Sequence, residues 1–261
     1  MNDLNPYLRQ IMLHGFGLEA QLKLRAAHVL VVGAGGLGCT ALQHLNAMGV
    51  GELTLIDPDS VDSSNLHRQI LYTPQDIGRP KVEVAAEVLR KQNPQTRINA
   101  LCEAIDVHNA LELLLNHDLV IDGSDRFETR YLLNDACLLT GKPYVYGALA
   151  EHQGQVGVFH LEENERISSY RDAFPNPPEA GSIRSCAEGG ILGVYAGLIG
   201  GFQALEAVKI LTGVGKPLAN RILTIDFRTM QNLQIDVPPG PRPAISEAEF
   251  KKKNYHLNCC L

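Results

Sequence analysis

The chain has 261 residues, of which 45% are hydrophobic, and a net charge of −6 at pH 7; this composition fits a globular protein with a full core and argues against disorder or a fibre. The only cationic block is Lys251–Lys253 near the C-terminus, so we expect no nucleic-acid partner. The six cysteines include no C-x-x-C pair and the chain starts without a signal-peptide pattern, which together predict a reduced cytoplasmic protein.

The first 27 residues carry apolar side chains at helical spacing and predict one or two short helices. Val29–Val32 follow as an apolar run that predicts a strand buried on both faces. This strand leads into Gly33-Ala34-Gly35-Gly36-Leu37-Gly38, a glycine-rich loop of the kind that binds phosphate between a strand and a helix.

The glycines of this loop have separate expected roles. Gly33 permits the sharp exit from the strand, and Gly35 and Gly36 remove β-carbons that would block a phosphate. Gly38 lets the next helix, expected over about 39–48, pack close to the sheet. Because a helix start offers unpaired N–H groups to an anion, the loop predicts a nucleotide site. It does not indicate which nucleotide.

A second predicted strand ends at Asp57, where a dinucleotide-binding fold places an acid on the ribose hydroxyls. Up to this residue NAD and ATP fit equally well. The following loops carry Asn65, Arg68 and Lys81. A triphosphate needs added cations or a metal more than a dinucleotide does. Each cation alone would be an ordinary surface charge, but together they favour ATP.

The order of these motifs resembles the ubiquitin-activating (E1-like) superfamily, in its bacterial branch of MoeB, ThiF and HesA sulfur-carrier adenylyltransferases. The similarity covers about residues 5–236 and rests on Gly33–Gly38, Asp57-Pro58-Asp59, Ser64–Gln69, Gly78-Arg79-Pro80-Lys81 and Gly123-Ser124-Asp125. The resemblance implies ATP and Mg²⁺ as cofactors. It also implies ATP-binding roles for Gly33, Gly35, Gly36, Gly38, Asp57, Asp59, Ser64, Asn65, Arg68, Lys81, Asp125 and Arg126.

Two more residues enter through the resemblance. Arg9 would reach the phosphates of a neighbouring subunit, which makes the expected enzyme a homodimer. Cys186 would be the candidate thiol for a covalent link with the carrier, since a thiol near a helix start can have a lowered pKa. From the residues alone, an exposed charge and a structural thiol explain Arg9 and Cys186 as well. The implied partners are a ubiquitin-like sulfur carrier ending in Gly-Gly and a sulfur donor protein.

A strand predicted over 118–122 ends at Gly123-Ser124-Asp125, which puts Asp125 at the edge where open α/β sheets bind ligands. Asp125 could also cap the helix predicted over 126–139. The resemblance implies a Mg²⁺ ligand instead, and the two roles are compatible.

The alternation of strands and helices predicts an α/β fold, with a Rossmann-like, doubly wound, mostly parallel sheet, an antiparallel C-terminal portion and a helical N-terminal segment. We expect one adenylation domain over 1–240, followed by a tail over 241–261. Within that domain the expected parts are N-terminal helices over 1–27, a nucleotide-binding half over 28–150 and a carrier-binding half over 151–236.

Three further segments complete the chain. Residues 162–184 lose the regular pattern and predict a long connection. The uncharged stretch 189–205 predicts a helix, about 191–211, that is buried against the sheet and does not span a membrane. Residues 221–226 and 229–236 predict an antiparallel hairpin.

Many members of the superfamily that the chain resembles hold a structural zinc with two C-x-x-C pairs. This chain has Ser169-Tyr170-Arg171-Asp172 where the first pair would be, and Cys259 and Cys260 are adjacent, which is a poor geometry for joint chelation. We therefore predict no zinc. The connection over 162–184 should then be more mobile unless a partner or the tail orders it.

The predicted function is ATP-dependent adenylylation of the C-terminal glycine carboxylate of the carrier, with release of pyrophosphate. One alternative is an E1-like enzyme that adenylylates a tRNA nucleoside or a peptide. Another is an NAD-dependent oxidoreductase, which only Gly33–Gly38 and Asp57 support. A non-catalytic E1-like scaffold is disfavoured by the presence of Arg68, Lys81 and Asp125.

Overall fold

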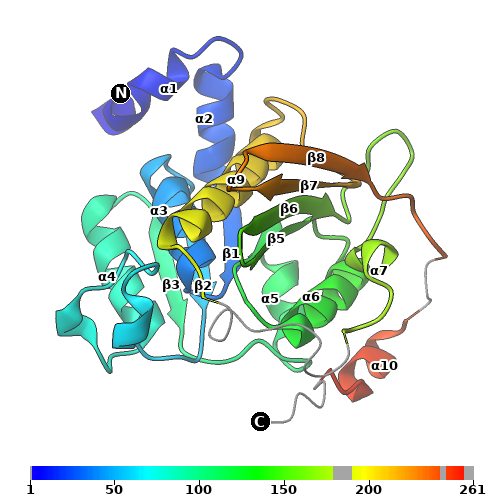
Figure 1. The fold of residues 1–261 in the computed structure, drawn as a ribbon. Helices are drawn as coiled ribbons and strands as arrows, with labels where there is room; N and C mark the ends of the chain where they lie inside the picture. Colours follow the sequence, from blue (N-terminus) through cyan, green and yellow to red (C-terminus); the bar gives the residue numbers. More distant parts are fainter. Residues whose placement is uncertain (1, 179–189, 242–244, 256–261) are drawn as a thin grey trace.

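The computed structural model describes residues 2–178, 190–241 and 245–255, and they form one mixed sheet with helices on both faces (Figure 1). The sheet has eight strands in the order β3-β2-β1-β4-β5-β6-β7-β8. The strands are β1 (His28–Val32), β2 (Glu52–Ile56), β3 (Arg97–Leu101), β4 (Leu119–Asp122), β5 (Tyr144–Ala150), β6 (Gln153–Phe159), β7 (Arg221–Asp226) and β8 (Gln231–Asp236).

The sheet is parallel in its first half and antiparallel in its second, as the sequence predicts. Strands β3, β2, β1, β4 and β5 pair in parallel, and β5 to β8 pair antiparallel. The chain leaves β1 toward β2 on one side, whereas β4 lies on the other. The carboxyl ends of β1 and β4 therefore flank the crevice where open α/β sheets bind ligands.

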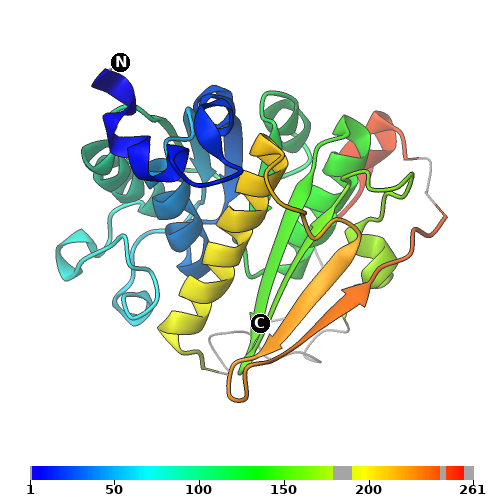
Figure 2. The ribbon, with the colours of Figure 1, turned by 90° about the horizontal axis from the view of Figure 1, so that it is seen from above.

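Alternate residues of β1 enter two different cores. Val29 and Val31 face the core under one layer of helices, and Leu30 and Val32 face the core under the other. The first layer contains α2 (Gly17–Ala26), α3 (Gly36–Ala47), α4 (Lys81–Gln92) and α9 (Gly193–Thr212). The second contains α5 (Ala110–Leu115), α6 (Phe127–Thr140), α7 (Tyr170–Ala173) and α10 (Glu247–Lys252), and Figure 2 shows the two layers from above.

The N-terminal segment starts with a 3₁₀-helix, η1 (Asn2–Tyr7), and continues through α1 (Leu8–Ile11) into α2. Two further 3₁₀ turns, η2 (Ser63–Asn65) and η3 (Pro74–Asp76), lie in the loop between β2 and α4. Tyr7 is buried against Gly49, where any β-carbon would come within 2.6 Å of its ring. This contact fixes the N-terminal segment at the far end of α3.

The predicted apolar helix is α9, and among the described helices it is the one long and apolar enough to cross a membrane. Half of the apolar 18-residue stretch of this helix is buried inside the structure. Its buried face packs on α3 and β5, where Ile199, Gln203 and Ala207 are fully covered. This packing agrees with the prediction of a helix against the sheet.

Candidate nucleotide-binding site

The glycine loop between β1 and α3 adopts a conformation that only glycine tolerates at several positions. Gly33 has a φ of +93°, and a β-carbon there would come within 2.8 Å of the Gly123 carbonyl. A β-carbon on Gly38 would lie 1.9 Å from the Gly33 oxygen. The first and last glycines therefore let the loop close on itself and on the turn after β4.

The two middle glycines differ from each other. A β-carbon on Gly35 would meet only ordinary contacts, the nearest being 3.7 Å away at Gln69 Nε2, so this position leaves space beside the loop. A β-carbon on Gly36 would lie 2.8 Å from that of Ala196 in α9. Gly36 is therefore required for helix packing, and α3 starts at this glycine rather than at the predicted Cys39.

Asp57 connects the end of β2 to the glycine loop. Its Oδ2 accepts a hydrogen bond from the Ala34 N–H at 2.7 Å, and its Oδ1 accepts one from the Asp59 N–H at 2.8 Å. Burial raises the pKa of Asp57, whereas the Lys81 charge and the two N–H groups oppose that rise. The carboxylate keeps further lone pairs free for the hydroxyls of a ribose.

Lys81 begins α4 and lies on the same strand edge, although the residue is only 5% exposed. Its Nζ donates to Asp59 Oδ2 at 2.9 Å, and this carboxylate is itself largely exposed. A buried ammonium needs a partner or a ligand. Asp59 supplies the partner, and Lys81 is thereby held at the edge without occupying the open space beside Gly35.

Arg68 follows η2 in the loop between β2 and α4. Its guanidinium donates to the Ser64 carbonyl at 3.2 Å and to Asn65 Oδ1, so η2 and Arg68 form one unit. A β-carbon on Gly36 would come within 3.6 Å of the Arg68 side chain. Arg68 thus lies near the start of α3, and Ser64 and Asn65 are joined to it by these hydrogen bonds.

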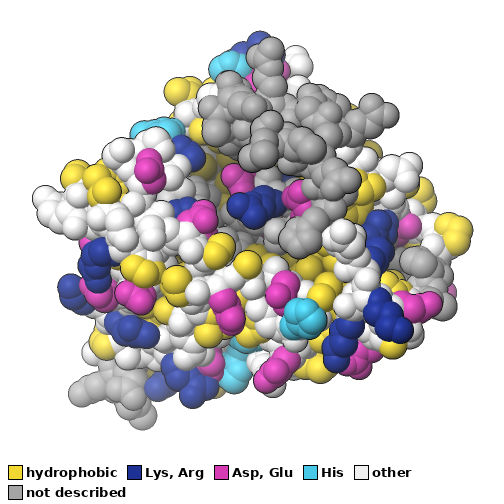
Figure 3. All heavy atoms as spheres, turned by 90° about the horizontal axis from the view of Figure 1, so that it is seen from below, with side chains coloured by type: hydrophobic (Ala, Val, Ile, Leu, Met, Phe, Trp, Pro, Cys, Tyr) yellow, Lys and Arg dark blue, Asp and Glu magenta, His cyan; other side chains and the backbone are white. Residues whose placement is uncertain are grey.

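Asp125 and Arg126 follow β4 and are both exposed. The helix cap is Arg126, and no side chain caps the helix, so the structure does not support a capping role for Asp125. Asp125 thus lies in the turn after β4, at the same strand edge as the glycine loop, and it is exposed. Charged side chains of both signs gather on this face, which Figure 3 shows from below.

Arg9 is the predicted residue that the structure does not bring to this edge. Its neighbour Gln10 donates to the Met48 carbonyl at 2.8 Å, at the C-terminal end of α3. The glycine loop lies at the other end of this 12-residue helix, about 17 Å away at 1.5 Å per residue. Cys186 lies outside the described residues.

Two residues near the loop had no assigned role in the sequence. Tyr72 donates from its hydroxyl to the Ala34 carbonyl at 2.7 Å and so fixes the loop in place. Gln69 is 4% exposed and lies beside Gly35, and among the described residues its Oε1 has no hydrogen-bond partner. A buried amide oxygen without a protein partner indicates that a ligand group can bond to it. Its position in the Ser64–Gln69 motif was the only available signal.

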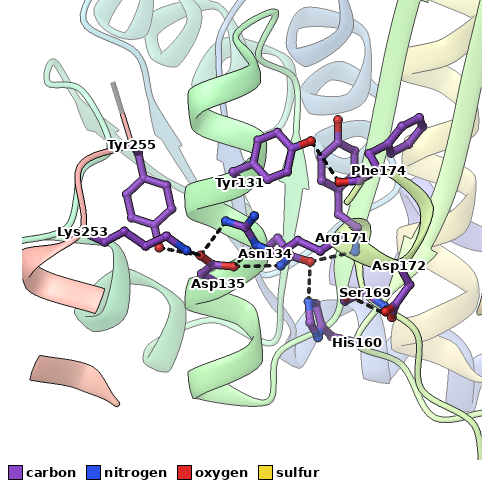
Figure 4. A network of polar contacts seen from close by, with 11 residues as sticks. Tyr131, Asn134, Asp135, His160, Ser169, Arg171, Asp172, Phe174, Lys253 and Tyr255 are labelled. Carbon is purple, nitrogen blue, oxygen red and sulfur yellow. Dashed lines mark hydrogen bonds and ion pairs between the residues drawn. The ribbon is translucent and has the colours of Figure 1, made fainter. Parts of the chain in front are cut away.

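A second polar cluster lies away from this edge, at the side where β6 ends and β5 begins. Asp135 of α6 accepts hydrogen bonds from Arg171 at 2.7 Å, from Lys253 at 2.7 Å and from the Tyr255 hydroxyl at 2.7 Å (Figure 4). Burial opposes the charge of Asp135, but these hydrogen bonds outweigh it and lower its pKa to about 2. We call this set, Asp135 with Arg171, Lys253 and Tyr255, the tail clip.

The tail clip includes Arg171, which lies in Ser169–Asp172, the segment where the resemblance to the E1-like superfamily implies a first C-x-x-C pair. Ser169 and Asp172 form a capping box on α7, and Asp172 Oδ1 accepts from the Gly240 N–H at 3.0 Å. Phe250 of α10 is fully buried nearby. The tail thus contacts α6, and Arg171 of α7 contacts the same Asp135 carboxylate. In the described part of the chain, no group of three or more His, Cys, Asp or Glu residues could hold a metal ion.

Residues 7–244 match the ThiF family. A protein named sulfur carrier protein adenylyltransferase from Thermus thermophilus is 46% identical, over 99% of this chain and 97% of that protein. The probable adenylyltransferase/sulfurtransferase MoeZ of Mycobacterium tuberculosis is 40% identical over 94% of the chain. The adenylyltransferase and sulfurtransferase MOCS3 of Drosophila willistoni is 44% identical over 88%.

The chain spans 63% of the length of MoeZ and 50% of the length of MOCS3, so those proteins contain further sequence beyond the shared region. Among solved structures, E. coli MccB with ATP superposes with a TM-score of 0.79 at 22% identity, covering 92% of this chain and 74% of that one. At this identity the superposition shows the shared fold alone.

Proposed function

Because this chain belongs to the ThiF family, we propose that it catalyses ATP-dependent adenylylation of the C-terminal glycine carboxylate of a ubiquitin-like sulfur carrier protein. The observation that carries the proposal is the gathering of the glycine loop, Asp57, Arg68, Lys81 and Asp125 at one strand edge. The name of the Thermus relative supports a sulfur carrier as substrate. Membership in this family disfavours the NAD-dependent alternative.

In the proposed reaction, an oxygen of the carrier carboxylate forms a bond to the α-phosphorus of ATP. The bond between the α-phosphorus and the oxygen that bridges to the β-phosphate breaks, and pyrophosphate leaves with that oxygen. A carboxylate is ionised at neutral pH, so no general base is needed. The protein has to place the reactants and neutralise charge. Lys81 and Arg68 suit this role because neighbouring oxygens already hold both side chains at the edge.

A magnesium ion fits the same edge, since Asp125 offers an exposed carboxylate and Mg²⁺ prefers oxygen ligands shared with phosphates. When bound, the ion neutralises charge on the polyphosphate. Asp57 would hold the ribose, and the space beside Gly35 and Gln69 would let the backbone approach the phosphates.

The carrier is proposed to dock on the antiparallel half of the sheet, in residues 151–236. Strand β8 is exposed along its whole length and forms one end of the sheet. Three large apolar side chains of this hairpin are exposed, namely Met230, Leu233 and Ile235. Exposed apolar side chains on an edge strand are typical of a protein-binding surface.

We also propose a homodimer. Exposed apolar side chains cover the N-terminal helices and one face of α9; they are Leu8, Met12, Leu13, Leu22, Val194, Leu198 and Leu205. A cavity of about 280 Å³ lies between this face and Arg68. Because Arg9 lies at the wrong end of α3 within its own chain, a second subunit is the available route by which it could reach a polyphosphate.

Two proposals concern the remaining chemistry. The tail clip supports the proposal that this protein binds no structural zinc, because hydrogen bonds and Phe250 already join the tail to α6 and α7. A measurement of one equivalent of zinc in the purified protein would contradict it. A sulfur donor protein and a covalent role of Cys186 are expected from the resemblance, and their test is a thiol-sensitive adduct with the carrier.

The function is tested by pyrophosphate release from ATP and Mg²⁺ with a panel of ubiquitin-like carriers that end in a free Gly-Gly. We expect release with one carrier and none when its terminal carboxylate is converted to an amide. Release without a carrier, or with the amide form, would contradict the proposed attack by the carboxylate. NAD binding without ATP binding would select the oxidoreductase instead.

A further inference from the structure

Asp122 is the last residue of β4 and is fully buried at the strand edge next to the candidate site. Its Oδ1 accepts from the Ser124 N–H at 2.9 Å and from the Ser124 hydroxyl at 2.6 Å. Its Oδ2 accepts from the Tyr144 hydroxyl at 2.6 Å. One buried carboxylate therefore joins the turn after β4 to the neighbouring strand β5.

The backbone around Asp122 is fixed from two other elements. Gln203 of α9, also fully buried, donates from Nε2 to the Asp122 carbonyl at 2.6 Å. The Gly123 N–H donates to the Val32 carbonyl at 2.7 Å, so the turn starts in register with the end of β1. A β-carbon on Gly33 would meet the Gly123 backbone first. The turn and the glycine loop are thus held against each other.

Arg130, one turn into α6, supplies a positive charge beside this carboxylate. It is 7% exposed, and its guanidinium carbon lies 4.9 Å from the centre of the Phe127 ring and 5.5 Å from that of Tyr146. Within the described residues it has no carboxylate oxygen within 4.0 Å. The positive charge of Arg130, held between two aromatic rings, stabilises the buried carboxylate of Asp122 electrostatically. Ser124 and Tyr144 donate the hydrogen bonds to that carboxylate.

Asp125 has no such support of its own. In the part of the chain that the structure describes, its carboxylate is exposed and has no hydrogen bond or ion pair. Its position relative to the glycine loop depends on the turn Gly123–Asp125, and the side-chain hydrogen bonds that hold this turn come from Asp122. When a buried residue positions a metal ligand, changing that residue lowers the affinity of the site for the metal ion.

We infer that Asp122 is a positioning residue: together with Ser124 and Tyr144 it holds Asp125 and the glycine loop in one geometry around the metal-bound polyphosphate. This inference rests on the proposed function for the assignment of Asp125. Asp122 does not touch the substrate in this role; it acts through the turn. Sequence reasoning assigned it no role because it appears only as the last residue of an apolar strand.

The test is Asp122→Asn, which replaces one of the two oxygens that accept from Ser124 and Tyr144 by an N–H₂ donor. The matched control is Asp135→Asn, because Asp135 is also a buried carboxylate that accepts several hydrogen bonds but lies in the tail clip. Binding of Mn²⁺ is followed by electron paramagnetic resonance in the presence of α,β-methylene-ATP, and binding of the nucleotide alone is followed by calorimetry. We expect Asp122→Asn to weaken Mn²⁺ binding about 10-fold or more.

Nucleotide binding without metal should change less than about 2-fold in Asp122→Asn, and Asp135→Asn should leave Mn²⁺ binding at the wild-type value. Equal Mn²⁺ affinity in the wild type and Asp122→Asn would overturn the inference, and so would equal losses in both variants. If Asp122→Asn does not fold, Ser124→Ala removes one of the same hydrogen bonds and should show a smaller loss. Because this titration needs no carrier, a wild type that binds Mn²⁺ and nucleotide but adenylylates no carrier contradicts only the proposed function.

Discussion

At the scale of single residues, the candidate site combines side chains that protein partners hold in place with side chains whose polar atoms remain available to a ligand. Lys81 is buried and paired to Asp59, and Arg68 is tied to Ser64 and Asn65. Gln69 Oε1 and the Asp125 carboxylate have no such partner in the described chain. Fixed cations lower the cost of reorganisation when negative charge builds up on a phosphate.

Lys81→Ala should lower the rate of pyrophosphate release about 100-fold or more, because the proposed reaction would lose a cation held in place for the α-phosphate. The control is Lys91→Ala, which removes an exposed lysine from the same helix. Steady-state assays at saturating ATP measure both. A loss below about 3-fold in Lys81→Ala would show that the lysine serves only its ion pair with Asp59.

Gly36→Ala should impair folding more than nucleotide affinity, since its β-carbon would meet Ala196 at 2.8 Å and not the open side of the loop. Gly35→Ala should do the reverse, because its surroundings leave room for a methyl group but not for a methyl group and a phosphate. Thermal unfolding and ATP titration of the two variants separate these effects. The opposite ranking would contradict the roles assigned to these glycines.

At the scale of elements, the tail joins α10 to α6 and α7, much as a structural metal site can join separate segments of a chain. Phe250 and the tail clip join α10 to α6, and Arg171 joins α7 to the same carboxylate. Removing one partner from a buried, charge-assisted hydrogen-bond network costs about 2–3 kcal/mol. Within the described part of residues 162–184, Arg171 contacts Asp135, the same carboxylate that binds the tail.

Asp135→Asn should lower Tm by about 5–10 °C at pH 7, given a few degrees per kcal/mol for a chain of this size. Since the folded pKa of Asp135 is lowered to about 2, its contribution is complete above the unfolded value and is lost as pH falls from about 5 toward 2. The difference in Tm between the variant and the wild type should therefore shrink over that range. Asp236→Asn, at an exposed ion pair, is the control and should change Tm little.

At the scale of the whole molecule, the proposed dimer requires Arg9 to act in the partner subunit. Arg9→Ala and Lys81→Ala proteins should each be inactive alone. After random reassociation, half of the dimers are mixed and each mixed dimer has one intact site, so activity should recover to about a quarter of wild type. Failure to recover any activity, with mixed dimers demonstrated by differential tags, would exclude shared sites.

The dimer surface itself is tested by Leu198→Glu, which places a charge on the exposed apolar face of α9. We expect this variant to elute as a monomer in size-exclusion chromatography. Leu115→Glu, at an exposed leucine on α5, should leave the oligomeric state unchanged. If the Leu198→Glu protein remains a dimer, the interface does not include this face of α9.

Much of the architecture was readable from local patterns. The strand before Gly33, the β7–β8 hairpin and the buried α9 were all predicted close to their observed bounds. Helix α3 begins three residues earlier than expected, because Gly36 and Gly38 serve close packing inside the helix. Glycines usually interrupt helices; here the close approach of Ala196 explains Gly36, and that of the Gly33 oxygen explains Gly38.

The fold class, the glycine-rich loop and the cations that follow it could be predicted from the sequence, because alternating apolar runs, glycine spacing and loop charges act within short stretches of chain. The hydrogen bonds from Ser124 to Asp122, the contacts of Asp135 with the tail and α7, and the place of Arg9 at the far end of α3 were visible only in the folded chain. These contacts join residues far apart in the chain, so their partners become known only once the sheet and its helices bring them together.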